Sequence, residues 1–129
     1  MSLNEHVKTP SMKDKLGILF IHGAGLGKYI WTEIEPNIKA SSLMIEFPNR
    51  NADDKANSKL RFEDYITKAI FDTQNFKKEK LIFVTHSIGG LVGLRIAESF
   101  KDKIVGFVGI GSAIPKNGNS FISCLPFPQ

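Results

Sequence analysis

The fold is indicated most clearly by the stretch LIFVTHSIGGLVGLRIAESF at residues 81–100. Its first five residues form an apolar, β-branched run, which is typical of a strand buried on both faces. Residues 87–100 instead place apolar side chains at helical spacing. Ser87 stands at the junction, and Gly89 and Gly90 follow it with no side chains to obstruct a sharp turn. The stretch therefore predicts a strand, an abrupt turn and a helix.

Short apolar runs alternate with longer amphipathic stretches over the rest of the chain. Further strands are predicted at residues 16–21, 43–47 and 104–110. Further helices are predicted at residues 29–40 and 61–76, and we expect Pro36 to kink or divide the first of them. This alternation predicts the α/β class, with a parallel sheet and helices on both faces.

The length of 129 residues is that of one domain, and a hydrophobic content of 42% is enough to build a core. We expect an N-terminal tail over residues 1–14, the α/β core over residues 15–111, and an irregular segment over residues 112–129 that could begin a lid. The polar stretch at residues 48–59 is predicted to form a surface loop. The last predicted strand has nothing predicted beside it, and stable proteins avoid such an open edge. We therefore expect a truncated form of the fold.

Charge and composition exclude several other classes of protein. The net charge of +4 comes without a nucleic-acid-binding motif, so we expect no nucleic-acid partner. No apolar run is long enough to span a bilayer, and the first fifteen residues lack the apolar stretch of a secretory signal. A single cysteine, Cys124, fits a reducing compartment and rules out a cysteine-only metal site. We expect a cytoplasmic protein with no membrane partner, metal or cofactor, and the oligomeric state stays open.

The junction Thr85-His86-Ser87-Ile88-Gly89-Gly90 has the arrangement of a nucleophile elbow. Such a turn holds the serine hydroxyl at the carboxyl end of the sheet, where the following helix directs free N–H groups toward the same point. Thr85 stands where the usual G-x-S-x-G pattern has its first glycine, and its side chain leaves less space for the sharp turn. The alternative is structural: Ser87 could serve only as the N-cap of the helix.

A second motif, His22-Gly23-Ala24-Gly25-Leu26-Gly27, directly follows the first predicted strand. A phosphate-binding P-loop would need a glycine where His22 stands and a serine or threonine two residues after Gly27. A dinucleotide-binding turn would use Gly23 and Gly25, with Glu46 as the ribose-binding acid, but its third glycine is missing. An oxyanion-hole loop explains the His-Gly pair together with the serine elbow, and it is the interpretation that we favour.

On these residues the chain resembles the α/β-hydrolase superfamily. Within it, FIHGAGLGKYIW (residues 20–31), the elbow and GLRIAESFKDKIVGFVGIGSAIP (residues 93–115) look most like the esterase and hydroxynitrile-lyase group that includes the plant methylesterases. The resemblance implies that Ser87 is the nucleophile of a serine hydrolase acting on a small-molecule carboxylic ester. It also implies an oxyanion hole made by the backbone N–H groups of Ala24 and Ile88.

The other two members of a catalytic triad follow the serine in this family. Here no Asp, Glu or His occurs after Asp102. We expect His22, Gly23, His86 and Gly89 to support the site; His86, next to Ser87 on a sharp turn, is a poor base for it and is expected to hydrogen-bond to the scaffold. Without its base a serine hydrolase loses on the order of a million-fold in rate. This chain alone is then expected to be nearly inactive, and the alternative is a non-catalytic or decayed binding module of the same fold.

Overall fold

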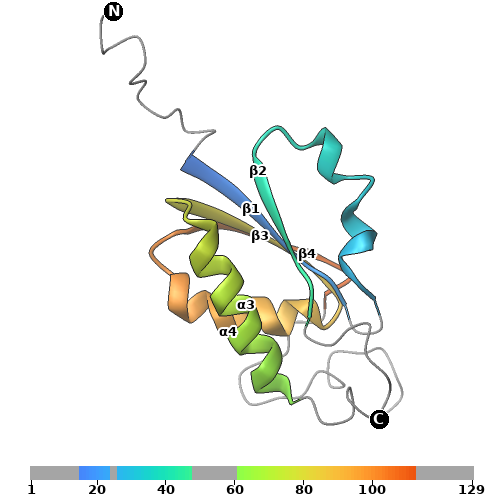
Figure 1. Ribbon diagram of the computed structural model, residues 1–129, viewed down its shortest axis with the longest axis vertical. Helices are drawn as coiled ribbons and strands as arrows, with labels where there is room; N and C mark the ends of the chain where they lie inside the picture. The colour runs from blue at the N-terminus through green and yellow to red at the C-terminus, as the bar shows by residue number, and fades with distance from the viewer. Residues whose placement is uncertain (1–14, 24–25, 48–60, 113–129) are drawn as a thin grey trace, which may run out of the picture.

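A four-stranded sheet forms the centre of the computed structural model, which describes residues 15–23, 26–47 and 61–112 (Figure 1). All pairs of neighbouring strands are parallel, in the order β2-β1-β3-β4. The strands are β1 (Leu16–Ile21), β2 (Ser41–Ile45), β3 (Lys80–His86) and β4 (Ile104–Ile110). The predicted α/β class is confirmed. Our expectations for residues 1–14, for the loop at 48–59 and for residues 113–129 lie outside the described residues.

The strand bounds agree with the sequence except in β2. β1 and β4 have the predicted ends, and β3 extends the predicted strand by one residue at each end. β2 begins two residues earlier than predicted, because Ser41 and Ser42 pair with Gly17 and Ile18 of β1. Hydrophobic patterning cannot reveal such a start, since the pairing uses backbone groups and tolerates exposed serines.

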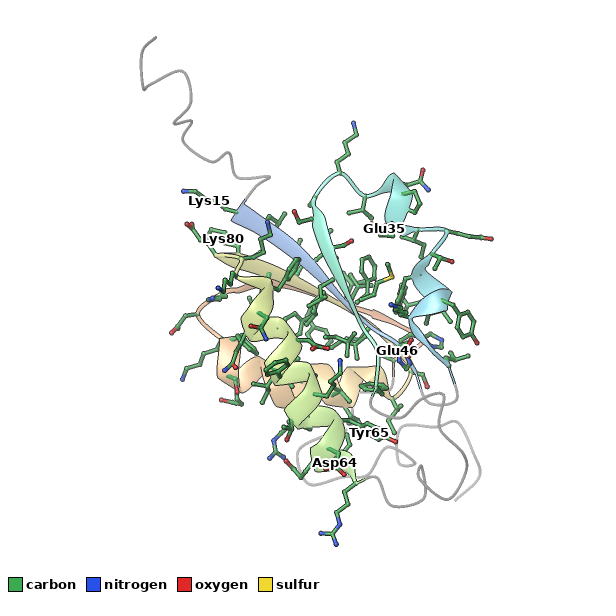
Figure 2. The ribbon with its side chains drawn as sticks, viewed as in Figure 1. Lys15, Glu35, Glu46, Asp64, Tyr65 and Lys80 are labelled. Atoms are coloured by element: carbon green, nitrogen blue, oxygen red, sulfur yellow. The ribbon has the colours of Figure 1, made fainter. Side chains whose placement is uncertain are left out.

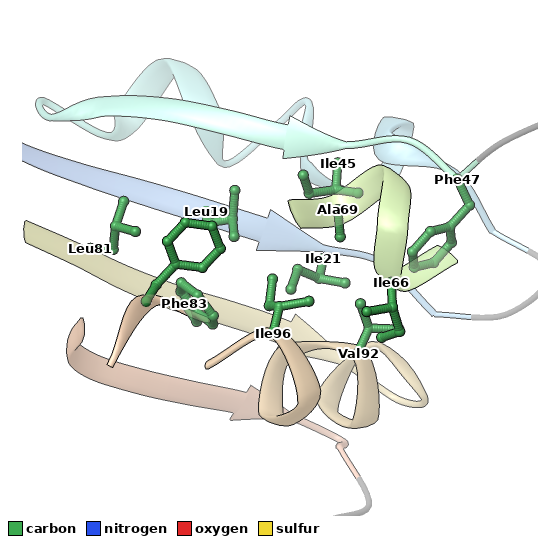
Figure 3. Close-up of a cluster of buried hydrophobic side chains, with 11 residues drawn as sticks. Leu19, Ile21, Ile45, Phe47, Ile66, Ala69, Leu81, Phe83, Val92 and Ile96 are labelled. Carbon is green, nitrogen blue, oxygen red and sulfur yellow. The ribbon is translucent and has the colours of Figure 1, made fainter. Parts of the chain in front are cut away.

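The main core lies between one face of the sheet and the helices α3 (Phe62–Phe76) and α4 (Gly89–Phe100) (Figure 3). Alternate residues of three strands point to this face, as expected from the period of two in a strand. The two helices contribute buried residues at helical spacing. The fully buried or nearly buried members of this core are Leu19, Ile21, Ile45, Phe47, Ile66, Ala69, Leu81, Phe83, Val92, Ile96 and Phe100.

The segment predicted as a helix at residues 29–40 forms two short 3-10 helices instead, η2 (Lys28–Trp31) and η3 (Glu35–Asn37). Pro36 lies in the first turn of η3, where its missing N–H costs nothing, whereas a continuous α-helix would lose a hydrogen bond there and clash with the preceding turn. Trp31 packs on Phe20 with ring centroids 5.0 Å apart. Phe20 alternates with the core residues of β1, so these 3-10 helices lie on the opposite face from α3 and α4.

The carboxyl ends of the four strands meet at one edge of the sheet, because all four are parallel. Lys15 and Lys80 lie together at the amino ends of β1 and β3, and Glu46 lies toward the opposite end (Figure 2). α4 starts at this second edge in close contact with β1. A Cβ atom added at Gly89 would lie 2.6 Å from the carbonyl oxygen of Ile21 and 2.7 Å from that of His22. Only glycine fits this approach.

Replacing Phe83 by alanine should lower the free energy of unfolding by about 3–5 kcal/mol, because it leaves a cavity in the fully buried core. The matched control is Phe71→Ala, since Phe71 is 62% exposed; it should cost no more than about 0.5–1 kcal/mol. Urea denaturation of both variants measures the difference. Equal losses of unfolding free energy in the two variants would show that Phe83 does not lie in the core.

Replacing Gly89 by alanine should destabilise the protein although alanine is the better helix former by about 1 kcal/mol. The added methyl group meets two backbone oxygens, which cannot move without displacing β1. Gly106→Ala is the control, since its Cβ would meet Ile82 at 3.5 Å, an ordinary van der Waals contact. A thermal melt should show a clearly lower midpoint for Gly89→Ala alone; similar midpoints would contradict the close approach of α4 to β1.

Candidate active site

Ser87 lies between β3 and α4 with a φ of 54°, in the left-handed region of backbone conformation. Within the described residues, Lys77 is the one other non-glycine residue with a positive φ, and it forms the C-cap of α3. An L-residue in this region is strained by about 1–2 kcal/mol relative to a helical or extended conformation. The Ser87 side chain is half-buried. The turn therefore holds a partly accessible serine in a conformation that costs free energy.

The interpretation of Ser87 as an ordinary N-cap is wrong. The N-cap of α4 is Ile88, in helical conformation, and no side chain caps the helix. The Ser87 carbonyl accepts the N–H of Gly90 at 3.1 Å, and the Ile88 carbonyl accepts that of Leu91 at 2.9 Å. Across the described part of the chain, the Ile88 N–H itself donates to no acceptor. That N–H group belongs to the positive end of α4 and can bind an anion.

Gly23, just beyond β1, packs directly against the elbow. A Cβ atom at Gly23 would lie 2.9 Å from both Ser87 Cβ and His86 Nδ1, closer than van der Waals contact allows. The first glycine of the His22–Gly27 motif is thus needed for space. The neighbouring Ala24 and Gly25 lie outside the described residues, so the geometry of an oxyanion donor at Ala24 stays a prediction.

Thr85 replaces the first glycine of the usual elbow pattern and is completely buried. Its hydroxyl donates to the Val108 carbonyl at 3.3 Å and lies 2.8 Å from Ser112 Oγ, which donates to it in turn. Room for the threonine comes from glycines: a Cβ at Gly93 would lie 3.0 Å from Thr85 Cγ2, and one at Gly90 3.6 Å from its Oγ1. The turn accommodates the larger residue because α4 carries glycines opposite it.

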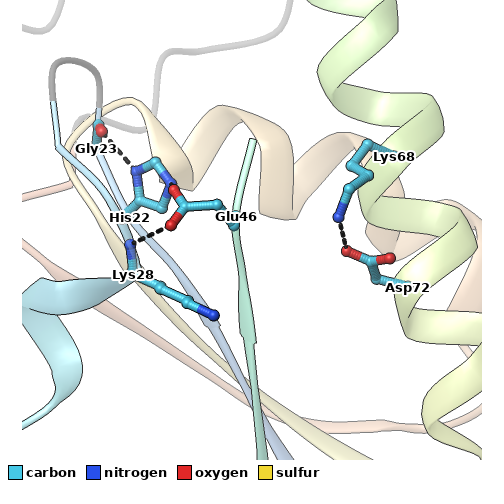
Figure 4. A network of polar contacts seen from close by, with 6 residues as sticks. All are labelled: His22, Gly23, Lys28, Glu46, Lys68 and Asp72. Carbon is cyan, nitrogen blue, oxygen red and sulfur yellow. Dashed lines mark hydrogen bonds and ion pairs between the residues drawn. The ribbon is translucent and has the colours of Figure 1, made fainter. Parts of the chain in front are cut away.

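His22 and Glu46 form a buried polar contact beside the elbow (Figure 4). Nδ1 of His22 lies 2.8 Å from the Gly23 carbonyl oxygen, and Nε2 lies 3.3 Å from Glu46 Oε1. The second carboxylate oxygen of Glu46 accepts the backbone N–H of Lys28 at 3.4 Å. The contact between Nε2 and Glu46 Oε1 has the distance of an ion pair but not the geometry of a hydrogen bond. The His22 ring thus lies against Gly23 and Glu46.

The hydrogen bond expected between His86 and the scaffold is not formed by its Nδ1 atom. Its Nδ1 is buried and has no hydrogen-bond partner in the described segments. The atom packs against Gly23 instead.

The structure brings together Ser87, Ile88, His22, Gly23, His86 and Gly89 at the carboxyl edge of the sheet. Two contributors were not anticipated: Glu46, considered only as a ribose-binding acid, and Ser112. The order of the strands would have indicated Glu46, because Ile45 pairs with Ile21 and the two following residues are neighbours. No cluster of three or more His, Cys, Asp or Glu residues suited to a metal occurs in the described part, and none of its helices is long and apolar enough to cross a membrane.

Solved structures of known proteins are similar to this fold. Polyneuridine aldehyde esterase has a TM-score of 0.72 and 20% identity, over 86% of this chain and 46% of its own. An extracellular α/β-hydrolase from a Paenibacillus species has a TM-score of 0.70 and 23% identity, over 81% and 44%. Tomato methylketone synthase I has a TM-score of 0.69 and 22% identity, over 80% and 42%. At these identities the similarity shows the fold, and this chain spans less than half the length of each.

No curated protein matches the sequence. The family described as the alpha/beta hydrolase fold matches residues 18–128, which include the sheet except for the first two residues of β1, the glycine loop and the serine elbow. The chain belongs to the α/β-hydrolase family.

Proposed function

We propose that this chain carries the nucleophile of a serine hydrolase that cleaves small-molecule carboxylic esters. The observation that carries the proposal is the positive φ of Ser87 at the junction of β3 and α4. A strained backbone conformation persists only where the surrounding structure enforces it, and such residues cluster at active sites. Membership in the α/β-hydrolase family, with esterases among the similar structures, supports hydrolase chemistry at this position.

In the proposed reaction the Ser87 oxygen attacks the ester carbonyl carbon, and the carbonyl oxygen becomes an oxyanion. The alcohol then leaves with a proton, and water hydrolyses the acyl-serine in a second step. The N–H of Ile88, which donates to no acceptor within the described residues, and, as predicted from the sequence, that of Ala24 would bind the oxyanion. Each donor of this kind contributes about 3–4 kcal/mol of transition-state stabilisation.

The base is the missing component of this mechanism. The two ring nitrogens of His22 lie against the Gly23 carbonyl and the Glu46 carboxylate, and no Asp, Glu or His occurs after Asp102. The proposal therefore requires a histidine and an acid from polypeptide outside these 129 residues. The similar structures are each more than twice as long as the part that this chain matches, which is consistent with that requirement.

The lack of a triad histidine and acid in these 129 residues also favours a second candidate function, a non-catalytic binding module of the α/β-hydrolase fold. It predicts that the full-length protein binds its ligand without covalent labelling of Ser87. The nucleotide-binding alternative is not retained, because the Glu46 carboxylate contacts His22 and Lys28 instead of being presented to a ribose.

Ser87→Ala and Ser87→Gly should both reduce ester hydrolysis by the full-length protein to background, a loss on the order of a million-fold. Glycine adopts a positive φ without strain, so Ser87→Gly should be at least as stable as Ser87→Ala. Hydrolysis of short nitrophenyl esters and labelling by a fluorophosphonate measure the first effect, and thermal unfolding measures the second.

Ser99→Ala is the matched control, since Ser99 is an exposed serine of α4. It should keep full activity and labelling. Undiminished turnover in Ser87→Ala would exclude Ser87 as the nucleophile. A full-length wild-type protein that neither hydrolyses esters nor reacts with the fluorophosphonate would favour the binding module.

A further inference from the structure

One carboxylate, that of Glu46, contacts both ends of the loop at residues 22–28. Its Oε1 lies 3.3 Å from His22 Nε2, and its Oε2 accepts the Lys28 N–H. Gly27 packs so closely on the carboxylate that an added Cβ would lie 3.2 Å from Oε1. The φ of Gly27 is −141°, an extended value open to any residue, and a Cβ there would require only a small shift of the Glu46 and Tyr29 side chains. Glu46 therefore joins the start and the end of the loop to the end of β2 (Figure 4).

The proton positions on His22 follow from its neighbours. Nδ1 faces a carbonyl oxygen, which can only accept, so Nδ1 carries a proton. Nε2 faces a carboxylate oxygen, which also accepts unless it is protonated. The His22 side chain is 1% exposed, so an unfavourable lone-pair contact would not be screened by water. An imidazolium carries a proton on each nitrogen and forms an ion pair with the Glu46 carboxylate at 3.3 Å, although the contact between Nε2 and Oε1 lacks the geometry of a hydrogen bond.

The bond from His22 to Gly23 also constrains the next N–H group. A trans peptide unit is planar, and its N–H is directed away from its C=O. The N–H across the same peptide bond belongs to Ala24, which lies outside the described residues and is predicted from the sequence to complete the oxyanion hole. A held Gly23 carbonyl would also restrain that N–H. Gly23 in turn packs against Ser87 Cβ. A continuous series of contacts thus leads from Glu46 through His22 and Gly23 to the elbow.

We propose that Glu46 is a positioning residue, whose carboxylate holds the Gly23 peptide unit against Ser87 through a doubly protonated His22. Its effect on catalysis rests on the proposed function of Ser87. The contact itself does not, and the two can be tested separately.

The structural part is tested by nuclear magnetic resonance on the full-length protein, with Glu46→Ala, Glu46→Gln and the control Glu33→Ala. Glu33 is an exposed acid whose side chain makes no contact within the described residues. Both ring nitrogens of His22 should be protonated at neutral pH in the wild type and in Glu33→Ala. In Glu46→Ala the Nε2 proton should be lost, and the Lys28 amide, whose N–H donates to the Glu46 carboxylate, should exchange at least about tenfold faster.

Glu46→Gln keeps the size of the side chain and an acceptor for the Lys28 N–H, so it is the control for general unfolding of the Glu46→Ala variant. It should restore slow exchange at Lys28 and leave His22 with the Nδ1 proton alone. A His22 ring and a Lys28 amide that behave in Glu46→Ala as they do in Glu33→Ala would overturn the proposal.

The catalytic part is tested by ester hydrolysis with the same variants. Glu46→Ala should lower kcat by roughly 10- to 100-fold with little change in KM, because a displaced oxyanion donor acts on the transition state. Glu33→Ala should keep the wild-type kcat. An unchanged kcat in Glu46→Ala with a disturbed His22 ring would overturn the positioning role. Persistent turnover in Ser87→Ala would reject the proposed function instead. The magnetic resonance signals of the His22 ring would still show whether His22 contacts Glu46.

Discussion

The contact between the first turn of α4 and the end of β1 is the constraint on which the rest of the structure depends. Gly89 lies against the carbonyl oxygens of Ile21 and His22, and Gly23 lies against Ser87. Two segments that are more than sixty residues apart in the sequence therefore meet with no side chain between them. The chain can leave β3 and enter α4 at this distance only through a sharp turn, and the positive φ of Ser87 is the result.

The neighbouring strands stabilise this turn through polar contacts. From β4, the Val108 carbonyl and the Ser112 hydroxyl bind the Thr85 side chain below the serine. From β2, Glu46 binds the two ends of the glycine loop above it. Thr85 is fully buried, and its hydroxyl needs these partners because an unpaired buried polar group is costly, whereas the Glu46 side chain is 33% exposed and restrains the loop more weakly. The strain at Ser87 is thus offset by contacts on both sides of the turn.

The fold could be predicted from the sequence because the strands are short apolar runs and α3 and α4 have clear helical spacing. The spacing of Ile30, Ile34 and Ile38 misled the prediction at residues 29–40, since Pro36 allows only short helical turns and leaves Ile34 exposed. The elbow was recognisable from Ser87 and the two glycines after it. The roles of Glu46 and Ser112 could not be read from the sequence, because each depends on which strands are neighbours and on the register between them.

The most direct measurement of the central claim is a crystal structure of the full-length protein after reaction with a phosphonate ester. We predict phosphorus bonded to Ser87 Oγ, an unchanged positive φ at that residue, and a phosphonyl oxygen within hydrogen-bond distance of the Ile88 N–H. A phosphonate attached to another residue, or a phosphonyl oxygen directed into solvent away from that amide, would contradict the account.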